Sequence, residues 1–452
     1  MLQKTFSVLL PLGISLVNAD LSGTVGPTSS FVHKADVMLC DVTDYGASSS
    51  ADFGPAFTSA WDACAEAGGG LVYIPPGEYP ISTGVNVKDA DDMAVQWDGT
   101  VYRDGDVSGD YFFSFTNLVN FELFSGNSKG ALQGYGYEYL KDGNYGTRLL
   151  LFHNINNASI HGLTLVDSPA YYVVIKTCTS LEAYNMLIRG VSTIGETDAF
   201  DVSGSNIWVH DVEITNGDEC VTVKSPSSNF RIGSIFCNLS GGTAIGSLGS
   251  DTMVQNITYQ NLYMNGADAC FIKTNGGNGT VSSISWDTVY VNGSAYPLAI
   301  DEAWGDAGTG IGVQISDLSF KDWYGYNSDN SRPTIRLECD PDVPCYDIIL
   351  DGVHLWTSDG DSVEWSCQNA YGSGACLKSG STSLSTYTTS SIVSTVSSWS
   401  LPGTMAGEFT SELSPTASFT IPPLATSFFP GQTPTSTLLS YSGPATYGAV
   451  QG

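Results

Sequence analysis

Four short polar stretches recur at nearly regular intervals in the middle of the chain, and the first two carry acidic side chains suited to catalysis. The stretches are Glu196-Thr197-Asp198, Gly217-Asp218-Glu219-Cys220, Ser240-Gly241-Gly242 and Phe271-Ile272-Lys273. If the interval equals one repeat of a stacked fold, Asp198 and Glu219 lie side by side. Asp218 directly precedes Glu219, so both can project outward only where the backbone bends.

Clustered carboxyl groups of this kind are typical of glycoside hydrolysis. One carboxylic acid protonates the leaving oxygen while a carboxylate activates or replaces water, with a gap of about 6.5–9.5 Å between the two for inversion. Mutual repulsion raises the pKa of at least one member and keeps a proton available. We assign Asp218 as the general acid, with Asp198 and Glu219 holding the water as base. The open alternative is that these acids decorate turns or bind Ca²⁺.

A repeated apolar pattern supplies the scaffold that must position these acids. The pattern apolar-x-x-apolar-x-apolar recurs every 23 to 34 residues, with copies rich in Val, Ile, Tyr and Trp separated by turn residues. Such a period is typical of a solenoid, and this composition favours short strands over helices. The sequence therefore predicts an all-β fold, a parallel β-helix whose coils stack at roughly 4.8 Å. The copies begin at Ile160, Ala183, Val209, Ile232, Tyr259, Trp286, Phe320 and Leu350.

A helix is expected at the N-terminal end of this solenoid. Apolar residues from Phe53 to Cys64 fall at steps of three and four, the pattern of one helical face, and Gly68 to Gly70 end it. Leu71 to Ile74 then read as a buried strand. Because a terminal coil exposes an apolar face, this helix is predicted to cap the core.

Both ends of the chain differ in composition from its middle. Residues 1–19 combine a basic residue, an apolar stretch and a small-residue exit, which predicts a secretory signal and an extracellular protein. Residues 20–378 are expected to form the β-helical catalytic domain. Residues 379–452 are rich in Ser, Thr and Pro, which predicts a C-terminal extension, either a spacer or carbohydrate-contacting arm, or an irregular tail packed along the solenoid.

The charge of the chain excludes nucleic acid as a partner. A formal net charge of −30 repels the phosphates of nucleic acid.

Other features of the sequence bear on membranes, metals and assembly. After the leader, no stretch is long and apolar enough for a membrane-spanning helix. No His or Cys spacing indicates a zinc site, so we expect no metal and no cofactor. We expect a monomer.

Ten cysteines in an oxidising compartment predict disulfides between sequence neighbours, with Cys178 and Cys270 left as buried thiols. The predicted pairs are Cys40 with Cys64, Cys220 with Cys237, Cys339 with Cys345, and Cys367 with Cys376. Asn-x-Ser/Thr sequons are expected to accept glycans on exposed turns. They begin at Asn157, Asn238, Asn256, Asn278 and Asn292.

The four polar stretches together resemble the signatures of glycoside hydrolase family 28. Polygalacturonases of that family carry Asn-Thr-Asp, Asp-Asp, Gly-His-Gly and Arg-Ile-Lys, where this chain has Glu-Thr-Asp, Asp-Glu, Ser-Gly-Gly and Phe-Ile-Lys. All three acidic positions persist, but Gly241 replaces the His and Phe271 replaces the Arg. The resemblance implies a right-handed parallel β-helix and inversion of configuration. Longer stretches, such as Asp-Glu-Cys-Val-Thr-Val-Lys-Ser-Pro from Asp218, are similar to the rhamnogalacturonan hydrolase branch.

The two departures bear on the substrate. In the polygalacturonases the Arg and Lys of the last signature are expected to grip galacturonate carboxylates. Phe271 cannot do so but can pack against the methyl group of rhamnose, while Lys273 remains to hold one galacturonate. The resemblance therefore implies an endo-acting hydrolase of rhamnogalacturonan, a pectic polysaccharide. Asp301 and Trp304, two coils beyond Glu219, are further candidates to line the cleft.

Three other functions stay open from the sequence. They are a polygalacturonase proper, a Ca²⁺-dependent pectate lyase on a similar solenoid, and a β-helical wall protein that binds glycan without cleaving it. Cleavage of polygalacturonate, unsaturated products, and binding without new reducing ends would distinguish them in turn.

Overall fold

Short strands make up most of this computed structural model, which describes residues 21–305, 308–329, 331–358, 363–380, 389–391, 413–426, 428 and 434–446. The predicted signal at residues 1–19 lies outside these residues, as does much of the Ser/Thr-rich tract after residue 380. Three α-helices and one 3₁₀ helix are present in the described part: α1 (Phe31–Val37), η1 (Val42–Tyr45), α2 (Phe53–Glu66) and α3 (Tyr137–Leu140). None of the helices in these ranges is long and apolar enough to cross a membrane.

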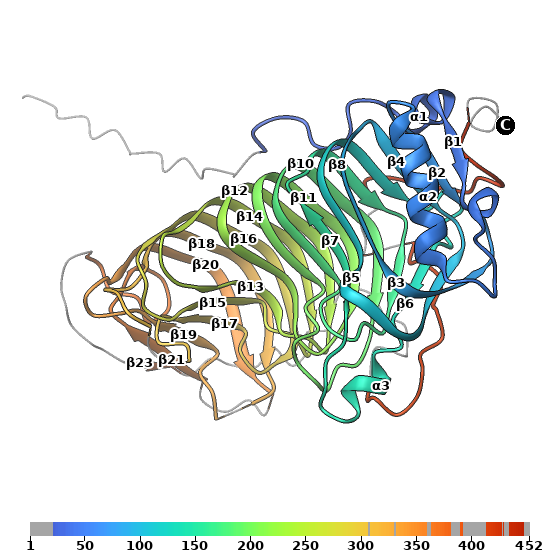
Figure 1. Ribbon diagram of the computed structural model, residues 1–452. Coiled ribbons are helices and arrows are strands. Elements are labelled where there is room, and N and C mark those ends of the chain that lie inside the picture. The colour runs from blue at the N-terminus through green and yellow to red at the C-terminus, as the bar shows by residue number, and fades with distance from the viewer. Residues whose placement is uncertain are drawn as a thin grey trace, which may run out of the picture.

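The strands stack into a parallel β-solenoid, as the sequence predicts. All strand pairs are parallel except that of β21 with β23. Figure 1 shows the coils piled along one axis, with α2 lying across the N-terminal end. The strands are β1 (Leu39–Asp41), β2 (Gly70–Ile74), β3 (Glu78–Asp91), β4 (Met93–Trp97), β5 (Thr100–Phe124), β6 (Ala131–Gln133), β7 (Arg148–His153), β8 (Asn156–His161), β9 (Thr164–Val166), β10 (Val173–Arg189), β11 (Phe200–Thr215), β12 (Glu219–Asn238), β13 (Gly242–Leu248), β14 (Thr252–Asn265), β15 (Cys270–Thr274), β16 (Gly279–Ser294), β17 (Leu298–Asp301), β18 (Gln314–Asn327), β19 (Ile335–Glu338), β20 (Cys345–Thr357), β21 (Val363–Gln368), β22 (Ala370–Ser373) and β23 (Thr389–Ser391).

One face of the solenoid alternates between an apolar inner row and a mixed outer row. The inner row is fully buried, and each aliphatic side chain in it stabilises the fold by about 1.5–3 kcal/mol. The adjacent outer row points away from the core because strand side chains alternate. Successive register partners in the inner row are Ile175, Val202, Val223, Ile245, Ile272, Ile300 and Leu337. Those in the outer row are Val174, Asp201, Thr222, Ala244, Phe271, Ala299 and Arg336.

The helix α2 caps the solenoid, as the periodicity predicts. Its buried residues include Phe53, Phe57, Trp61 and Cys64. The Asp52 side chain accepts a hydrogen bond from the Gly54 N–H at 3.3 Å, so the N-terminus has a side-chain cap. The apolar face of α2 thereby covers the first coil.

All four predicted disulfides are present, and the two remaining cysteines are free and buried, so the predicted pairing is confirmed. Disulfides in this number are typical of proteins that fold in an oxidising compartment.

The expectation of five exposed glycan acceptors is wrong for Asn238, which is completely buried. Stacked turns place it in an amide ladder: its Nδ2 donates to Thr215 Oγ1 at 3.0 Å, and its Oδ1 accepts from Asn265 Nδ2 at 2.6 Å. Asn292 Nδ2 continues the ladder at 2.5 Å. A buried amide without hydrogen-bond partners costs free energy, and the ladder supplies those partners. Asn238 can therefore be buried, where it is not accessible from solvent. Asn278 is exposed, and Asn157, Asn256 and Asn292 are partly exposed.

The described parts of the C-terminal extension pack along the solenoid and return to its N-terminal end, as Figure 1 shows in dark red. The Ser192 N–H donates to Leu413 O at 2.8 Å, and the Leu413 N–H donates to Ser192 Oγ at 2.8 Å. Farther on, the Gln96 side chain bonds Gly443 O at 2.9 Å and Ala445 N at 2.7 Å. These contacts favour the packed tail over a free spacer. The boundary at residue 378 stays a prediction.

Candidate active site

The three acids that the sequence singles out lie together at the start of two adjacent strands. Asp198 comes just before β11, Asp218 directly precedes β12, and Glu219 is the first residue of β12. One carboxylate oxygen of each acid lies within 4.8 Å of one oxygen of each of the other two. These closest oxygens are nearer to one another than the expected gap of about 6.5–9.5 Å, because Asp198 lies on the coil next to the other two acids, roughly 4.8 Å away, and Asp218 and Glu219 are neighbours in the chain.

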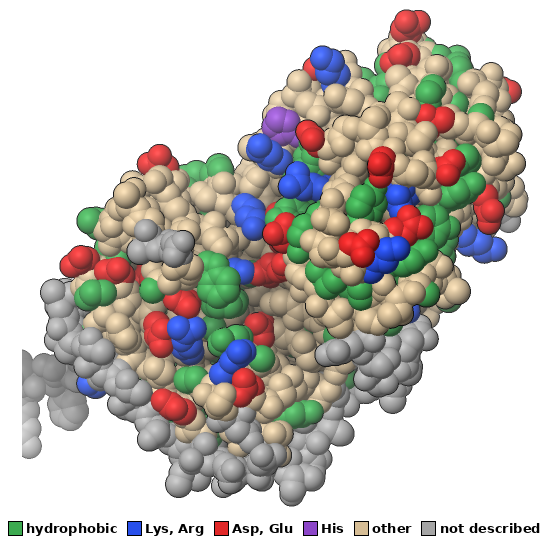
Figure 2. Space-filling view, turned by 60° about the horizontal axis from the view of Figure 1, so that its bottom comes forward, with side chains coloured by type: hydrophobic (Ala, Val, Ile, Leu, Met, Phe, Trp, Pro, Cys, Tyr) green, Lys and Arg blue, Asp and Glu red, His purple; other side chains and the backbone are tan. Residues whose placement is uncertain are grey.

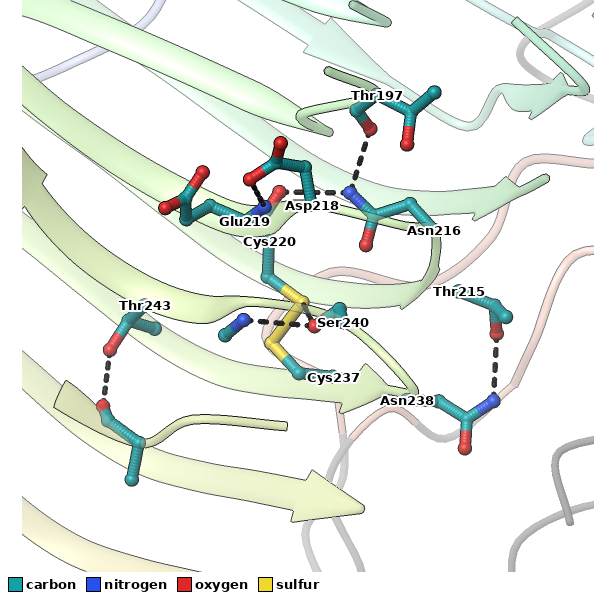
Figure 3. The surroundings of a disulfide bond; sticks show 12 residues. Thr197, Thr215, Asn216, Asp218, Glu219, Cys220, Cys237, Asn238, Ser240 and Thr243 are labelled. Carbon is teal, nitrogen blue, oxygen red and sulfur yellow. Dashed lines mark hydrogen bonds between the residues drawn. A yellow bond between two sulfur atoms is a disulfide. The ribbon is translucent and has the colours of Figure 1, made fainter. Parts of the chain in front are cut away.

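A bend in the backbone lets two consecutive acids point outward. The register between β12 and β13 shifts between Glu219 and Val221, as the sequence argument requires. Such bulges occur frequently beside active sites, where they redirect a side chain. The disulfide from Cys220 to Cys237 lies directly behind the bend (Figure 3).

Polar contacts hold the turn before this bend. Asn216 Nδ2 donates to the backbone oxygens of Thr197 at 2.7 Å and Glu219 at 2.9 Å, which ties the two acidic turns together. Figure 3 shows Asn216 lying between them. A side chain at Gly217 would overlap the backbone oxygen of Ile194, so only glycine fits there.

Gly241 supports the acids through its backbone. Its N–H donates to Asp218 O at 2.8 Å, and a Cβ atom at this position would lie 3.0 Å from the Glu219 nitrogen. This contact is tighter than ordinary van der Waals packing, so the coil comes close to the acids where the polygalacturonases have a histidine. The predicted role of Gly241 in substrate binding stays a prediction.

Asp218 has opposing influences on its proton. Its Oδ2 accepts a hydrogen bond from the Glu196 N–H at 2.6 Å, which lowers its pKa, and its Oδ1 accepts one from the Glu219 N–H at 3.0 Å. Burial and the Glu219 side chain outweigh this effect. Burial, together with the hydrogen bond to the Glu219 side chain and the charge of that side chain, raises the pKa of Asp218 to about 7. A carboxyl group with such a pKa still carries a proton in mildly acidic solution, as a general acid must.

Glu219 has the opposite character. Burial raises its pKa, but the hydrogen bond from Asp218 and the nearby charge of Lys273 outweigh burial and lower the pKa of Glu219 to about 2. Lys273 Nζ forms a buried ion pair with Glu219 Oε1. The pKa values of Asp218 and Glu219, neighbours in the chain, are thus shifted in opposite directions, a pattern that is typical of an acid and a base in one active site.

Asp201 and Lys224 are site residues that the sequence analysis missed. Burial and the charge of Asp201, followed by the charges of the other two acids, raise the pKa of Asp198 to about 9. Lys224 Nζ lies 3.3 Å from Asp201 Oδ1 and donates to Gly246 O at 2.8 Å. Strand alternation was the available signal, since the apolar neighbours Phe200 and Val202 point inward and leave Asp201 pointing outward.

An aromatic wall lies beside Lys273. The ring of Phe271 packs against Trp304 with centroids 5.2 Å apart, and Lys273 Nζ lies 5.3 Å and 5.1 Å from the two rings. Phe271 is only 6% exposed, whereas Trp304 is 40% exposed. Trp304 therefore offers the larger surface for a sugar, and Phe271 mainly supports it.

Asp301 is buried and lies one strand beyond Lys273. Its Oδ2 pairs with Arg336 Nη1 at 3.1 Å, and its Oδ1 accepts the Ala303 N–H at 3.0 Å. The structure brings Asp301 to the same face as the acids, but both of its oxygens already have partners.

Figure 2 shows this face of the molecule hollowed between two raised parts, with acidic and basic side chains gathered in the hollow among apolar ones. Two groups of side chains in the described ranges have metal-ligand spacing. One is the trio of Asp198, Asp218 and Glu219, and the other contains Glu302 with two cysteines that are already joined in a disulfide. The trio is thus the better oxygen-ligand set for a cation, although Lys273 already neutralises Glu219.

Comparisons with known proteins agree with this geometry. The family described as "Glycosyl hydrolases family 28" matches residues 85–377. The chain is 54% identical to "Probable rhamnogalacturonase C" of Aspergillus flavus, over 97% of this chain and 98% of that protein. It is 46% identical to "Rhamnogalacturonase A" of Aspergillus aculeatus, over 95% of this chain and 98% of that protein.

Among solved structures, the fold is similar to that of an endo-xylogalacturonan hydrolase from Aspergillus tubingensis. The TM-score is 0.65 at 24% identity, over 76% of this chain and all of that chain. A polygalacturonase from Erwinia carotovora has a TM-score of 0.61 at 20% identity, over 78% of this chain and all of that chain.

Proposed function

Because the chain belongs to glycosyl hydrolases family 28, we propose that it is a secreted hydrolase that cleaves the rhamnogalacturonan backbone of pectin internally. The bond is the α-1,2 linkage between galacturonate and rhamnose. The observation that carries the proposal is the pairing of Asp218 and Glu219, adjacent acids whose pKa values are shifted in opposite directions.

The two acids divide the reaction between them. Asp218 gives its proton to the leaving oxygen as the glycosidic bond breaks. Glu219, ionised, accepts a proton from the water that attacks the anomeric carbon. Each transfer of this type contributes roughly 10²- to 10⁴-fold to the rate. Because the two side chains are hydrogen-bonded, the proton gained by Glu219 can return to Asp218 before the next cycle.

Asp198 has a supporting part in this scheme. With its pKa near 9 it keeps a proton while Glu219 is ionised, so it orients the water by hydrogen bonding and Glu219 acts as the base. Its carboxyl oxygen lies within 4.8 Å of the other two, close enough to share one water.

The choice of substrate rests on the wall around Lys273. Lys273, although paired with Glu219, can also donate to one galacturonate carboxylate, while Trp304, supported by Phe271, offers apolar surface to the methyl group of a neighbouring rhamnose. A polymer that alternates these two sugars matches both features. Homogalacturonan would place a second carboxylate against the rings, without a cation to receive it.

Purified protein is expected to release oligosaccharides from debranched rhamnogalacturonan and to leave polygalacturonate intact, because Phe271 stands where a carboxylate-binding arginine would be. New reducing ends measured on both polymers, side by side, test this. Efficient cleavage of polygalacturonate would establish a polygalacturonase instead. Unsaturated products would indicate a lyase, and tight binding without new reducing ends a glycan-binding protein.

The stereochemical outcome is proposed to be inversion, as the family resemblance implies. Carboxyl groups only about 5–5.5 Å apart usually favour retention through a covalent intermediate. Here Glu219, the only one of the three whose pKa is lowered, is paired with Lys273, which makes it a weak nucleophile but leaves it ionised to take the proton of the water that Asp198 orients. Proton NMR during the first minutes of hydrolysis should show the β-anomer of the new reducing galacturonate before the α-anomer. Early appearance of the α-anomer would contradict inversion.

A further inference from the structure

A pocket of about 490 Å³ adjoins the acids on the N-terminal side. One cationic side chain, that of Arg148, lines it and takes no part in the reaction proposed above. Its wall includes Glu196, whose N–H donates to Asp218, so the pocket opens next to the general acid. Arg148 is the only Lys or Arg among its lining residues, which also include Tyr145 and Tyr171.

The Arg148 guanidinium is positioned but not neutralised. It lies over the ring of Tyr171 at 5.0 Å and that of Tyr111 at 5.7 Å. It makes no ion pair within 4.0 Å with any carboxylate in the part of the chain that the structure describes. The side chain is partly exposed. A flat cation fixed between aromatic rings has already lost most of its conformational freedom, so a ligand that binds it pays little for ordering it.

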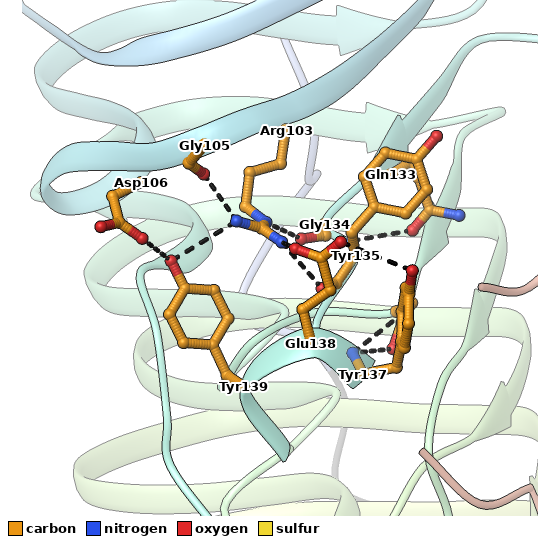
Figure 4. Close-up of polar contacts among 10 residues, drawn as sticks. Arg103, Gly105, Asp106, Gln133, Gly134, Tyr135, Tyr137, Glu138 and Tyr139 are labelled. Carbon is orange, nitrogen blue, oxygen red and sulfur yellow. Dashed lines mark hydrogen bonds and ion pairs between the residues drawn. The ribbon is translucent and has the colours of Figure 1, made fainter. Parts of the chain in front are cut away.

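The neighbouring Arg103 shows what a structural arginine looks like in the same region (Figure 4). Its Nε donates to Gly134 O at 2.7 Å, its Nη1 donates to Gly105 O at 2.6 Å, and its Nη2 pairs with Glu138. Its guanidinium also lies over Tyr139, which lines the pocket. The hydrogen-bonding capacity of Arg103 is therefore used within the protein, whereas Arg148 hydrogen-bonds the Tyr111 side chain and, within the described residues, pairs with no carboxylate.

We propose that Arg148 binds the carboxylate of a galacturonate residue of the substrate chain, a few sugars away from the bond that is cleaved. This inference rests on the proposed function. A guanidinium can form two parallel hydrogen bonds with a carboxylate, the strongest pairing available to such an anion. In a protein with a formal charge of −30, an anionic polymer needs local cations wherever it is held. The pocket carboxylates of Asp110 and Glu196 can accept hydrogen bonds from sugar hydroxyls.

The position of Arg148 along the solenoid fits a polymer that spans several coils. β7, which begins at Arg148, pairs with β10, and β10 pairs with β11. Two to three strand spacings therefore separate Arg148 from the acids, roughly 10–14 Å. A second pocket of about 330 Å³ shares Gly109 and Asp110 with the first and extends the groove past Leu151. The groove thus continues beyond Arg148, away from the acids, as internal cleavage of a long chain requires.

The test compares Arg148→Gln and Arg148→Lys with wild type on debranched rhamnogalacturonan. Arg148→Gln is expected to raise KM by roughly 10- to 100-fold with little change in kcat, because the contact is the same in the ground and transition states. Arg148→Lys should recover part of the loss. The difference between wild type and Arg148→Gln should shrink at high salt. Arg231→Gln, which removes an arginine stacked on Trp208 elsewhere on the solenoid, is the matched control and should leave KM unchanged.

Two results would overturn the assignment of Arg148. One is a wild-type KM in Arg148→Gln. The other is a fall in kcat with unchanged KM, which would mean that the residue acts by supporting the turn that carries Glu196. Failure of the wild-type protein to cleave rhamnogalacturonan at all would instead remove the proposed function, so the two failures can be told apart.

Discussion

Replacement of Asp218 by Asn is expected to lower kcat on rhamnogalacturonan by roughly 10²- to 10⁴-fold while the protein stays folded. Asparagine keeps the shape of the side chain and can still accept the hydrogen bond from the Glu196 N–H, but it has no proton to give to the leaving oxygen. Initial rates of reducing-end release measure the effect, and circular dichroism and the melting temperature check the fold.

Asp62→Asn provides the matched control for this experiment. Asp62 is exposed on α2, the cap at the N-terminal end of the solenoid, and its replacement makes the same chemical change outside the site. Its kcat should equal that of wild type. A turnover number of Asp218→Asn within a few fold of wild type would remove Asp218 from the role of general acid.

Replacement of Glu219 by Gln is expected to produce a loss of similar size, again roughly 10²- to 10⁴-fold in kcat. The glutamine cannot accept a proton from water, and it leaves Lys273 without its ion-pair partner inside the site. A second effect identifies the mechanism. Because the Glu219 side chain raises the pKa of Asp218, its neutralisation should lower that pKa, so the residual activity should decline at a lower pH than in wild type.

Glu66→Gln, at the exposed end of α2, is the control for the Glu219 variant and should behave as wild type. If Glu219→Gln keeps the wild-type pH dependence despite losing activity, the Glu219 side chain does not raise the pKa of Asp218. If it keeps wild-type activity, Glu219 is not the base.

The elements that the sequence predicts well are those set by periodicity. Apolar residues at steps of three and four require a helix that buries one face, and α2 buries Phe53, Phe57 and Trp61 as expected. The recurring strand pattern requires coils that stack in register, and this stacking alone brings Asp198 beside Glu219. Burial of the inner row of side chains fixes which face of each strand points into the solenoid.

The features that the sequence did not reveal depend on side-chain direction and local partners. Asn238 fits a glycosylation sequon, yet the stacking of equivalent turns places its amide in a buried ladder with Thr215 and Asn265. The sequence predicts that Lys273 binds a galacturonate carboxylate, whereas in the structure Lys273 forms an ion pair with Glu219. This ion pair helps to lower the pKa of Glu219. The outward direction of both Asp218 and Glu219 depends on the bend at the start of β12, and no residue spacing in the sequence gives its geometry.

The pH dependence of kcat/KM for the wild-type protein on rhamnogalacturonan tests the central claim most directly. Activity requires Glu219 without its proton, so it should be lost only as the pH falls towards about 2. It also requires Asp218 with its proton, so it should decline as the pH rises through about 7. A profile with a plateau at mildly acidic pH and this decline near neutrality is the predicted result. A value of kcat/KM that keeps rising through pH 7 would contradict acid catalysis by Asp218.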